Sequence, residues 1–256
     1  MFWILQDNLI NVETRDGLAD LLTRSQTSFA KVRLVPFFNL LDGEIPHVTG
    51  EVFVYGSTGL GQVAKKLGWL PGYFDENLDY ELMLSKYNDK ALNHGAVCST
   101  IADMQRRHER FFLRPVLDSK SFAGTVMSWA EFEVFRANLS RIGREEESTL
   151  RLSDRVVAAP LASIFAEYRF FVIAGRVITG SQYKIGDLIR SDSDVPQEVV
   201  QFAQACVDCW SPNKAFTIDV AMTPDGPRVI ELNSANSAGF YACDQGAFIN
   251  AVNSLL

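Results

Sequence analysis

Apolar residues follow two alternating spacings over the first part of the chain. Short apolar runs at residues 2–5, 31–37 and 51–56 have the length of buried strands. Between the first two runs, the leucines of residues 15–25 recur at helical spacing. Because strands and helices alternate here, we expect residues 1–85 to form a small α/β domain.

The pattern changes in the middle of the chain. Residues 80–110 are predicted to be mainly helical, and residues 110–126 to form a strand, a polar turn and a second strand. Residues 128–142 have helical spacing, and Ser128 with Glu131 has the spacing of a capping box. We therefore expect one short strand pair between two helical segments.

The C-terminal part of the chain predicts two hairpins around a helix. Residues 167–184 contain two β-rich runs on either side of Gly175, and residues 195–210 have helical spacing. The runs at residues 215–222 and 228–233 flank a turn rich in Pro and Gly. These signals predict antiparallel strands in this part of the molecule.

Three oxygen-bearing side chains share one face of the last predicted hairpin. If the hairpin is symmetric about Asp225, then Asp219 lies opposite Glu231. Side chains alternate along a strand, so Glu231 and Asn233 lie on the same face. The apolar residues of the two strands are expected to point the other way, into the core: Ile218, Val220, Ile230 and Leu232.

Two carboxylates that face each other repel unless a cation separates them. Oxygen ligands without His or Cys suit Mg²⁺, which proteins hold by one or two carboxylates while substrate phosphates fill other positions. We therefore predict that Asp219, Glu231 and Asn233 bind Mg²⁺. A solvated sheet face followed by a flexible loop would give the same pattern, and the residues alone leave this alternative open.

The composition indicates a protein with a sizeable core, and its overall charge balance shows no basic footprint for nucleic acid, which leaves the alternative of a local basic cleft open. Of the 256 residues 47% are hydrophobic, and the formal net charge is −7. No apolar run reaches roughly 18 residues and no basic leader is present, so neither a membrane span nor a signal peptide is expected. Four cysteines form no dense framework, which favours a cytoplasmic location, and Cys206 and Cys209 are expected to pack in the core.

The segment DVAMTPDGPRVIELNSANSAG, residues 219–239, resembles the metal-binding hairpin of the ATP-grasp superfamily. In that superfamily an Asp on one strand and a Glu-x-Asn on the next hold Mg²⁺-ATP. Three upstream segments look like the strand and loop that cover the phosphates, the adenine-binding hinge, and the Glu-x-Arg strand with its partner. In this order they are FFLRPVLDSKSFAG (111–124), VVAAPL (156–161) and EYRFFVIAGRVITGSQY (167–183).

One position in this pattern resembles a particular clade of the superfamily. Arg114 stands where a lysine is commoner, and Lys120 and Lys184 complete the set. This set is similar to that of the clade named for one arginine and two lysines, whose members are found in bacteria and phages. For a phage protein the expected location would be the cytoplasm of the host. The resemblance covers about residues 86–245.

The resemblance implies an α/β (α+β) protein with the ATP-grasp fold. Residues 1–85 would form the pre-ATP-grasp α/β domain, and residues 86–256 a two-lobed ATP-grasp domain with antiparallel sheets. The central lobe is expected at about residues 86–155 and the C-terminal lobe at about residues 156–256.

It also implies an enzyme, namely an ADP-producing ligase that forms carbon–nitrogen bonds with ATP and Mg²⁺ as cofactors. ATP would phosphorylate a carboxylate, and an amine or another nucleophile would attack the acyl phosphate. The carboxylate would belong to a small molecule, an amino acid, a peptide or a protein, with no membrane and no nucleic acid as partner. The alternatives are a non-catalytic Mg²⁺-ATP-binding module and a phosphotransferase that forms a stable phosphoester.

The resemblance assigns roles to five charged residues. Arg114 and Lys120 would contact phosphate oxygens, while Arg169 and Lys184 would face the γ-phosphate or the acyl phosphate. Glu167 would bind the ribose or pair with a neighbouring cation. Arg114, Arg169 and Lys184 are thus the expected catalytic residues. A structural role at the surface or in an ion pair is the alternative for each.

The remaining assignments concern the nucleotide base and the acceptor substrate. Ser237 and Gly239 would border the acceptor, and Lys86 would contact the nucleotide. The adenine is expected to lie against the hinge residues: Val157, Ala158, Ala159 and Leu161.

Overall fold

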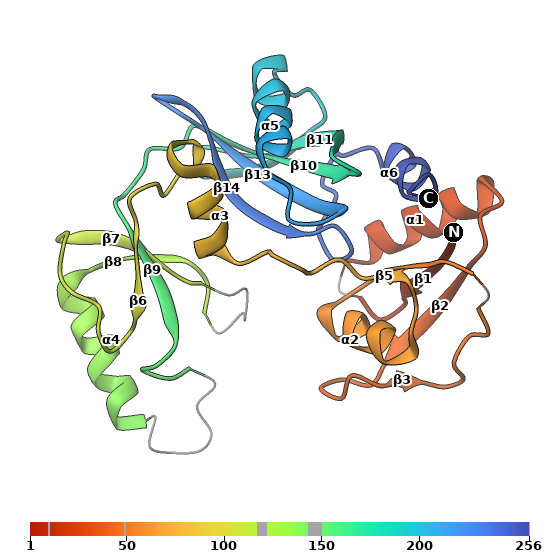
Figure 1. The fold of residues 1–256 in the computed structure, drawn as a ribbon, viewed down its shortest axis with the longest axis horizontal. Helices are drawn as coiled ribbons and strands as arrows, with labels where there is room; N and C mark the ends of the chain where they lie inside the picture. The colour runs from red at the N-terminus through yellow and green to blue at the C-terminus, as the bar shows by residue number, and fades with distance from the viewer. Residues whose placement is uncertain (10, 49, 117–121, 143–149, 256) are drawn as a thin grey trace.

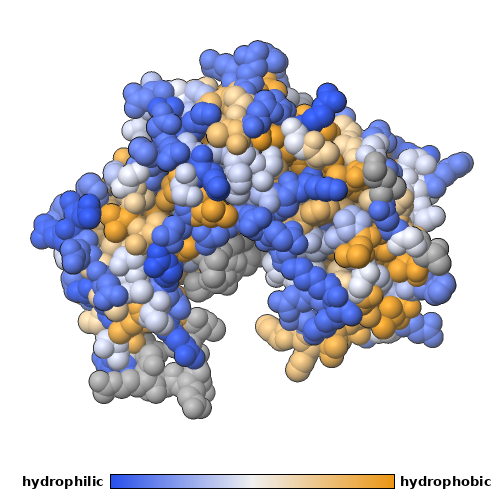
Figure 2. Space-filling model, in the orientation of Figure 1, coloured by the Kyte–Doolittle hydropathy of each residue, from blue (hydrophilic) through white to orange (hydrophobic). Residues whose placement is uncertain are grey.

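The fold is that of a computed structural model, which describes residues 1–9, 11–48, 50–116, 122–142 and 150–255. Three β-sheets organise these residues (Figure 1). Apolar clusters pack against each of them. In the same orientation, the space-filling view shows a hollow between the parts that Figure 1 labels as the central lobe and the N-terminal domain (Figure 2). Among the described residues no helix is both long and apolar enough to cross a membrane.

The N-terminal domain is a mostly parallel sheet with strand order β3-β2-β1-β4-β5. Its strands are β1 (Phe2–Gln6), β2 (Phe29–Leu34), β3 (Leu41–Asp42), β4 (Val52–Tyr55) and β5 (Pro71–Gly72). Helices α1 (Val12–Arg24) and α2 (Thr58–Leu67) follow β1 and β4. The predicted strands and helix of this domain are confirmed, because the central strands β1 and β4 are buried and therefore read as continuous apolar runs.

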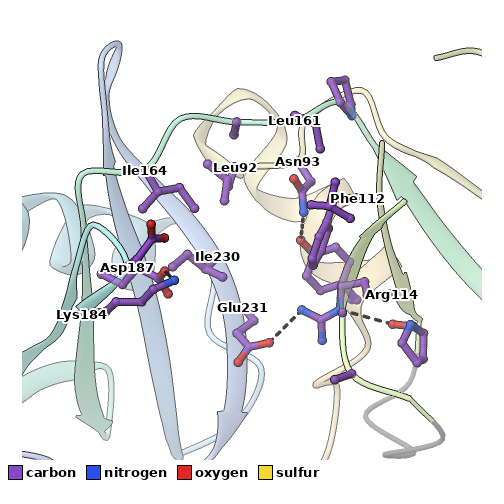
Figure 3. A pocket seen from close by; sticks show the side chains of 18 of the residues that line it. Leu92, Asn93, Phe112, Arg114, Leu161, Ile164, Lys184, Asp187, Ile230 and Glu231 are labelled. Atoms are coloured by element: carbon purple, nitrogen blue, oxygen red, sulfur yellow. Dashed lines mark hydrogen bonds and ion pairs between the residues drawn. The ribbon is translucent and has the colours of Figure 1, made fainter. Parts of the chain in front are cut away.

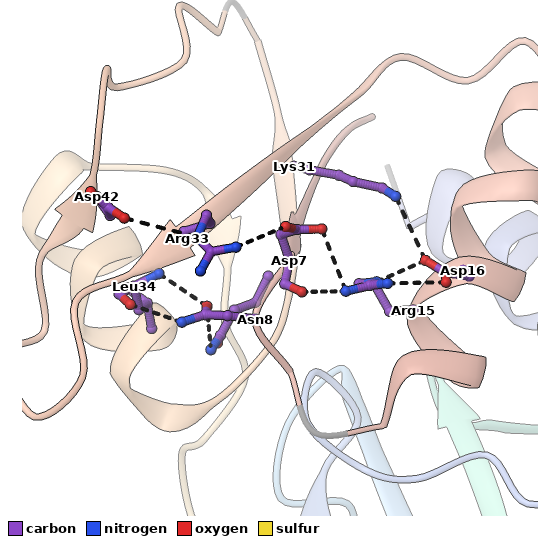
Figure 4. Close-up of polar contacts among 9 residues, drawn as sticks. Asp7, Asn8, Arg15, Asp16, Lys31, Arg33, Leu34 and Asp42 are labelled. Carbon is purple, nitrogen blue, oxygen red and sulfur yellow. Dashed lines mark hydrogen bonds and ion pairs between the residues drawn. The ribbon is translucent and has the colours of Figure 1, made fainter.

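Polar side chains fasten the end of β1 to its neighbours (Figure 4). Asn8 donates to the carbonyl of Leu34 at 2.9 Å and accepts from the N–H of Leu34 at 3.1 Å, which prolongs the contact between β1 and β2. Arg15 on α1 donates to the backbone carbonyl of Asp7 and pairs with Asp16 at 2.8 Å. These contacts fix the loop at the carboxyl end of β1.

The central lobe is a four-stranded antiparallel sheet with order β6-β9-β7-β8. Its strands are β6 (Val97–Thr100), β7 (Arg110–Pro115), β8 (Thr125–Ser128) and β9 (Arg155–Ala159). The predicted capping box starts helix α4 (Trp129–Ile142) and is confirmed: Ser128 Oγ accepts from the Glu131 N–H at 3.2 Å, and the Glu131 carboxylate accepts from the Ser128 N–H at 2.7 Å. Strand β9 lies inside this sheet, whereas the sequence-based division placed residues 156–159 in the C-terminal lobe.

The C-terminal lobe is a five-stranded antiparallel sheet with order β12-β11-β10-β13-β14. Its strands are β10 (Ala166–Ile173), β11 (Arg176–Ile185), β12 (Leu188–Asp192), β13 (Ala215–Thr223) and β14 (Gly226–Ser234). Helices α3 (Tyr80–Tyr87) and α5 (Gln197–Cys209) pack on one face, while α6 (Gln245–Asn253) and the N-terminal domain cover the other. Both predicted hairpins and the predicted helix of this region are confirmed.

Two sequence-based expectations are wrong in this part of the molecule. Residues 80–110 are helical only in α3 and in the short 3-10 turn Asn88–Lys90, because the chain after this turn supplies β6, whose pairing with β9 outweighs local helical propensity. Cys206 is buried as predicted, but Cys209 is exposed, since it is the last residue of α5.

Asn236 makes several of the buried hydrogen bonds that join the N-terminal domain to the loop after β14. The fully buried Asn236 donates to the carbonyls of Val54 at 2.6 Å and Gly72 at 3.0 Å. Its side-chain oxygen accepts from the Phe74 N–H at 2.9 Å, and its backbone carbonyl accepts from the Gly56 N–H at 2.8 Å. The loop that follows β14 is therefore fixed to the N-terminal domain.

We expect Asn236→Ala to lower the free energy of unfolding by about 3 kcal/mol, because it removes three buried hydrogen bonds between the two parts of the molecule. Urea denaturation measures this loss. Asn39→Ala is the matched control, since Asn39 bonds the Gln62 side chain at an exposed position, and it should change stability by no more than about 0.5 kcal/mol. Equal losses for the two variants would contradict the role of Asn236.

Candidate active site

A cavity of about 820 Å³ lies between the central and C-terminal sheets (Figure 3). Strands β7 and β8 contribute to one wall, and β10, β11 and β14 contribute to the other. Its volume is in the range of sites that hold small molecules and cofactors. Five residues predicted from the sequence line it: Arg114, Leu161, Glu167, Lys184 and Glu231.

The β13–β14 hairpin carries the three predicted metal ligands. Asp219 pairs directly with Glu231, so the predicted register is confirmed at this point. A β-bulge follows, and Val220 pairs with Val229. The extra residue, Ile230, lines the cavity beside Glu231, so its expected place in the core is wrong. The other apolar residues predicted to face the core are buried: Ile218, Val220 and Leu232.

Asp219 is buried, with 1% of its surface exposed, and Arg169 compensates its charge. The two residues form a bidentate ion pair, in which Arg169 Nε lies 2.8 Å from Asp219 Oδ1 and Arg169 Nη2 lies 2.7 Å from Oδ2. Pairing of β10 with β13 places them directly opposite each other. Arg169 Nη1 also donates to the carbonyl of Gly239 at 3.4 Å.

Burial and pairing act against each other in this ion pair. Burial raises the pKa of the Asp219 carboxyl, although the Arg169 guanidinium counteracts the rise. Burial alone would lower the pKa of Arg169, but the charge of Asp219 outweighs it, and the pKa lies above its ordinary value. Two short charge-assisted hydrogen bonds favour the ionised pair over the neutral one. The pair is therefore an ionic cross-link within the sheet.

Glu231 is held from the opposite wall of the cavity. Arg114 on β7 places Nη1 2.8 Å from Glu231 Oε2, and Asn233 donates Nδ2 to Glu231 Oε1 at 3.0 Å. Burial alone would raise the pKa of Glu231, but Arg114 and Asn233 outweigh this effect and hold the pKa below its ordinary value. The Arg114–Glu231 pair thus joins the two lobes across the cavity.

A second pair of opposite charges lies on the C-terminal wall. Lys184 Nζ is 2.9 Å from Glu167 Oε1, and the Tyr183 hydroxyl donates to Glu167 Oε2 at 2.7 Å. Burial raises the pKa of Tyr183, and the charges of Asp219 and Glu167 add to the rise. The Tyr183 ring stacks on Tyr241, with the ring centroids 4.9 Å apart. Tyr183 is therefore a neutral donor that orients Glu167.

The donor set of the hairpin fits Mg²⁺ in its chemistry. Asp219, Glu231 and Asn233 offer carboxylate and amide oxygens, which are the ligands that Mg²⁺ prefers. In the part of the chain that the structure describes, no cluster of three or more His, Cys, Asp or Glu side chains could hold a metal. Arg169 and Arg114 compensate the two carboxylates instead. A metal ion held here would therefore compensate the carboxylate charges that the two guanidinium groups now compensate.

Comparison with protein families identifies the chain. A family model of the ATP-grasp domain, family 3 of the clade named for one arginine and two lysines, matches residues 46–252. The chain belongs to this family. The predicted superfamily, clade and fold are confirmed, and the prediction of an ATP-grasp ligase is confirmed at the level of the family. No curated protein matches the sequence.

Solved structures share the ATP-grasp fold at low sequence identity. D-Cycloserine synthetase DcsG gives a TM-score of 0.67 at 12% identity and covers 100% of this chain and 99% of its own. The ATP-grasp ligase PsnB, complexed with a minimal precursor, gives a TM-score of 0.59 at 13% sequence identity, and the match covers 100% of this chain and 99% of PsnB. D-Alanine–D-alanine ligase from Bacillus anthracis, complexed with ATP, gives a TM-score of 0.58 at 11% sequence identity, and the match covers 91% of this chain and 86% of the ligase. Another PsnB structure contains Mg and ADP.

Of the residues predicted to form the adenine-binding hinge, only those after the end of β9 line the cavity. Val157 and Ala158 pair with both β6 and β7, and Ala159 pairs with β7, so this backbone is engaged in the sheet. Val157 and Ala159 are also fully buried. The residues that follow β9 line the cavity: Pro160, Leu161, Ala162 and Ile164.

The other predicted site residues are distributed more widely. Gly239 contacts Arg169 through its carbonyl, and Ser237 is exposed on the same loop. Lys86 is exposed near the end of α3 and is not among the described residues that line the cavity. Lys120 lies outside the described residues.

Four polar or aromatic residues around the cavity were not predicted from the sequence. Tyr183 and Tyr241 flank Arg169, with its guanidinium 5.8 Å and 5.3 Å from their ring centroids. Tyr80 and Asn93 line the cavity and come from a segment with no recognisable motif. Only Tyr183 had a local signal, since it precedes Lys184 in the sequence.

We expect Arg169→Met to lower the free energy of unfolding by about 3–5 kcal/mol, because it leaves the buried carboxylate of Asp219 without a counter-ion. The double variant Arg169→Met/Asp219→Leu should regain much of this loss, since it removes the charge as well. Chemical denaturation of the three proteins measures both effects.

Arg190→Met is the matched control, because Arg190 pairs with Asp192 at an exposed position 3.7 Å away. Its cost should stay below about 1 kcal/mol. A similarly small cost for Arg169→Met, or a double variant that is less stable than the single one, would contradict the buried cross-link.

Proposed function

We propose that this protein is an ATP-dependent ligase that activates a carboxylate. ATP would phosphorylate the carboxylate, an amine or another nucleophile would displace the phosphate from the acyl phosphate, and ADP and phosphate would leave. The observation that carries the proposal is the Arg114–Glu231 pair, whose 2.8 Å contact spans the cavity between the two lobes. The pair joins a guanidinium that would bind phosphate to a carboxylate that would bind the metal.

The structural neighbours support a substrate class. They include a D-alanine–D-alanine ligase, a D-cycloserine synthetase and a ligase complexed with a precursor peptide. We therefore propose an amino acid or a peptide as the source of the carboxylate. A cytoplasmic location, where ATP and Mg²⁺ are available, goes with this activity.

Side chains that line the cavity, with Asp219 and Asn233 beside it, would bind the nucleotide in two parts. Arg114 and Lys184 would contact phosphate oxygens, and Arg114 offers the planar fork that suits bidentate contacts. Asp219, Glu231 and Asn233 would hold Mg²⁺, which when bound neutralises charge on the phosphates. Apolar side chains would enclose the base and exclude water: Leu92, Phe112, Leu161, Ile164 and Ile230.

Phosphoryl transfer requires alignment and charge compensation more than covalent work by the protein. Arg169 on β10 lies between the buried Asp219 and the carbonyl of Gly239. Gly239 belongs to the loop after β14, which would border the acceptor substrate. From this position Arg169 would stabilise the charge of the acyl phosphate. Ser237, exposed on the same loop, would border the acceptor.

We expect the purified protein to release ADP from ATP in the presence of Mg²⁺ when a panel of amino acids and short peptides supplies acid and amine. Chromatography of the nucleotides separates ADP from AMP, and omission of Mg²⁺ or addition of EDTA should stop the release. AMP as the product would contradict the acyl-phosphate mechanism. Tight binding of ATP without turnover would identify a binding module, and a stable phosphoester would identify a phosphotransferase.

Glu231→Gln should lower turnover by at least about 100-fold, because it removes the carboxylate that faces both the cavity and Arg114. Its melting temperature should stay close to that of the unchanged protein. Glu133→Gln on α4 is the control, since Glu133 pairs with Arg136 and is not among the described residues that line the cavity, and it should keep full activity. Normal turnover in Glu231→Gln would show that Glu231 holds no metal.

A further inference from the structure

Arg114 rests on an aromatic ring from another part of the chain. Its guanidinium carbon lies 4.1 Å from the centroid of the Tyr80 ring, while its Nη1 reaches Glu231. Tyr80 belongs to α3 and lines the same cavity. A cation over the face of a ring is attracted by the ring quadrupole, most strongly where water is excluded.

Tyr80 is fixed in place by two hydrogen bonds and by packing in the core. It is the first residue of α3, whose start is capped by Asp79 accepting from the Leu82 N–H at 2.8 Å. Its hydroxyl accepts from Asn93 Nδ2 at 2.6 Å, and its N–H donates to the Val116 carbonyl at 3.3 Å. The ring is only 3% exposed and packs in the core of the C-terminal lobe. Tyr80 is therefore a rigid support.

The segment around Tyr80 is attached to both lobes. Val116 directly follows the strand that carries Arg114, so the N–H of Tyr80 ties α3 to the central lobe. At the other end of the segment, the Leu92 N–H donates to the Val229 carbonyl at 2.8 Å, which ties it to β14 beside Glu231. Tyr80 thus stands where the two walls of the cavity meet.

The type of contact matters for how Arg114 would work. Tyr80 offers the guanidinium a π face and not a competing carboxylate, and with the ring in place Arg114 Nη1 still donates to Glu231. A carboxylate that held Arg114 would have to give way before a phosphate could bind. Tyr80 can hold the guanidinium unchanged while its donors pass from Glu231 to another anion. Burial also raises the pKa of Tyr80, which keeps the ring neutral.

We propose that Tyr80 is a positioning residue that holds Arg114 ready for the nucleotide phosphates. This inference rests on the proposed function, because it assumes that Arg114 binds phosphate. A long side chain that is oriented before the ligand binds loses less conformational entropy on binding. Loss of the ring should therefore weaken nucleotide binding through Arg114, and not through a general loss of structure.

The test measures binding of Mg²⁺ with the non-hydrolysable analogue AMPPNP by isothermal titration calorimetry. Tyr80→Leu is expected to bind roughly tenfold more weakly, whereas Tyr80→Phe, which keeps the ring, should stay within about twofold of the unchanged protein. In the background of Arg114→Met, Tyr80→Leu should cause no further loss, because the two residues act as one unit.

Tyr87→Leu is the matched control. Tyr87 is also a buried tyrosine of α3, but its hydroxyl bonds the Trp210 carbonyl and it does not line the cavity. This variant should lower the melting temperature without changing the affinity for Mg²⁺-AMPPNP. Equal losses of affinity in the Tyr87→Leu and Tyr80→Leu variants would show a structural effect and overturn the proposal.

Two further outcomes keep the test decisive. Wild-type affinity in folded Tyr80→Leu, or an undiminished loss in the Arg114→Met background, would overturn the role of Tyr80. If Tyr80→Leu does not fold, Tyr80→Phe and its ring-fluorinated analogues replace it: affinity should fall as fluorination weakens the π face, and constant affinity would refute the proposal. Failure of the unchanged protein to bind Mg²⁺-AMPPNP would instead reject the proposed function.

Discussion

A buried carboxylate needs a counter-ion, since the cost of burying it alone would consume much of the stability of a domain. Asp219 lies in this situation inside the C-terminal sheet, and Arg169 on the neighbouring strand supplies the charge. The pair fixes β10 against β13. Because β13 in turn pairs with β14, it also fixes where Glu231 meets the cavity. The position of Glu231 thus depends on the Arg169–Asp219 ion pair within the sheet.

The same sheet is tied to the rest of the molecule on two sides. Asn236 binds it to the N-terminal domain through buried hydrogen bonds, while Arg114 reaches it from the central lobe. The first tie consists of neutral groups that water does not reach, and the second is an ion pair at a cavity. A ligand with its own charges can compete for the second but not for the first. The contact of Arg114 with β14 therefore depends on what the cavity contains, whereas the hydrogen bond from Tyr80 to Val116 holds the central lobe independently of it.

Much of the fold could be predicted because local signals agree with tertiary structure. The turn at Asp225 predicts the hairpin, but the register next to the turn would pair Asp219 with Ile230, and only the bulge shifts the strand pairing of Asp219 to Glu231. The partner of Asp219 is a different matter, since Arg169 is 50 positions away and meets it only because β10 lies next to β13. No local spacing encodes that neighbourhood. The run VVAAPL likewise indicates a hinge, but the end of strand β9 within it depends on pairing with two other strands.

Residue type suggested the chemistry of the site, and topology decided which residues take part. Tyr80 and Asn93 are ordinary helix and turn residues until the fold brings them to the cavity beside Arg114. Lys86 has the positive charge expected of a residue that binds a nucleotide, yet the direction of α3 leaves it at the surface.

The bulge at Ile230 gives β14 one residue more than β13 requires. On either side of it Val229 and Leu232 face the core, so a chain lacking Ile230 would still alternate correctly and keep Glu231 toward the cavity. Loss of one codon here would straighten the strand and widen the pocket by the space of one aliphatic side chain. The strand therefore contains one residue whose removal would change the volume of the cavity while Glu231 keeps its position.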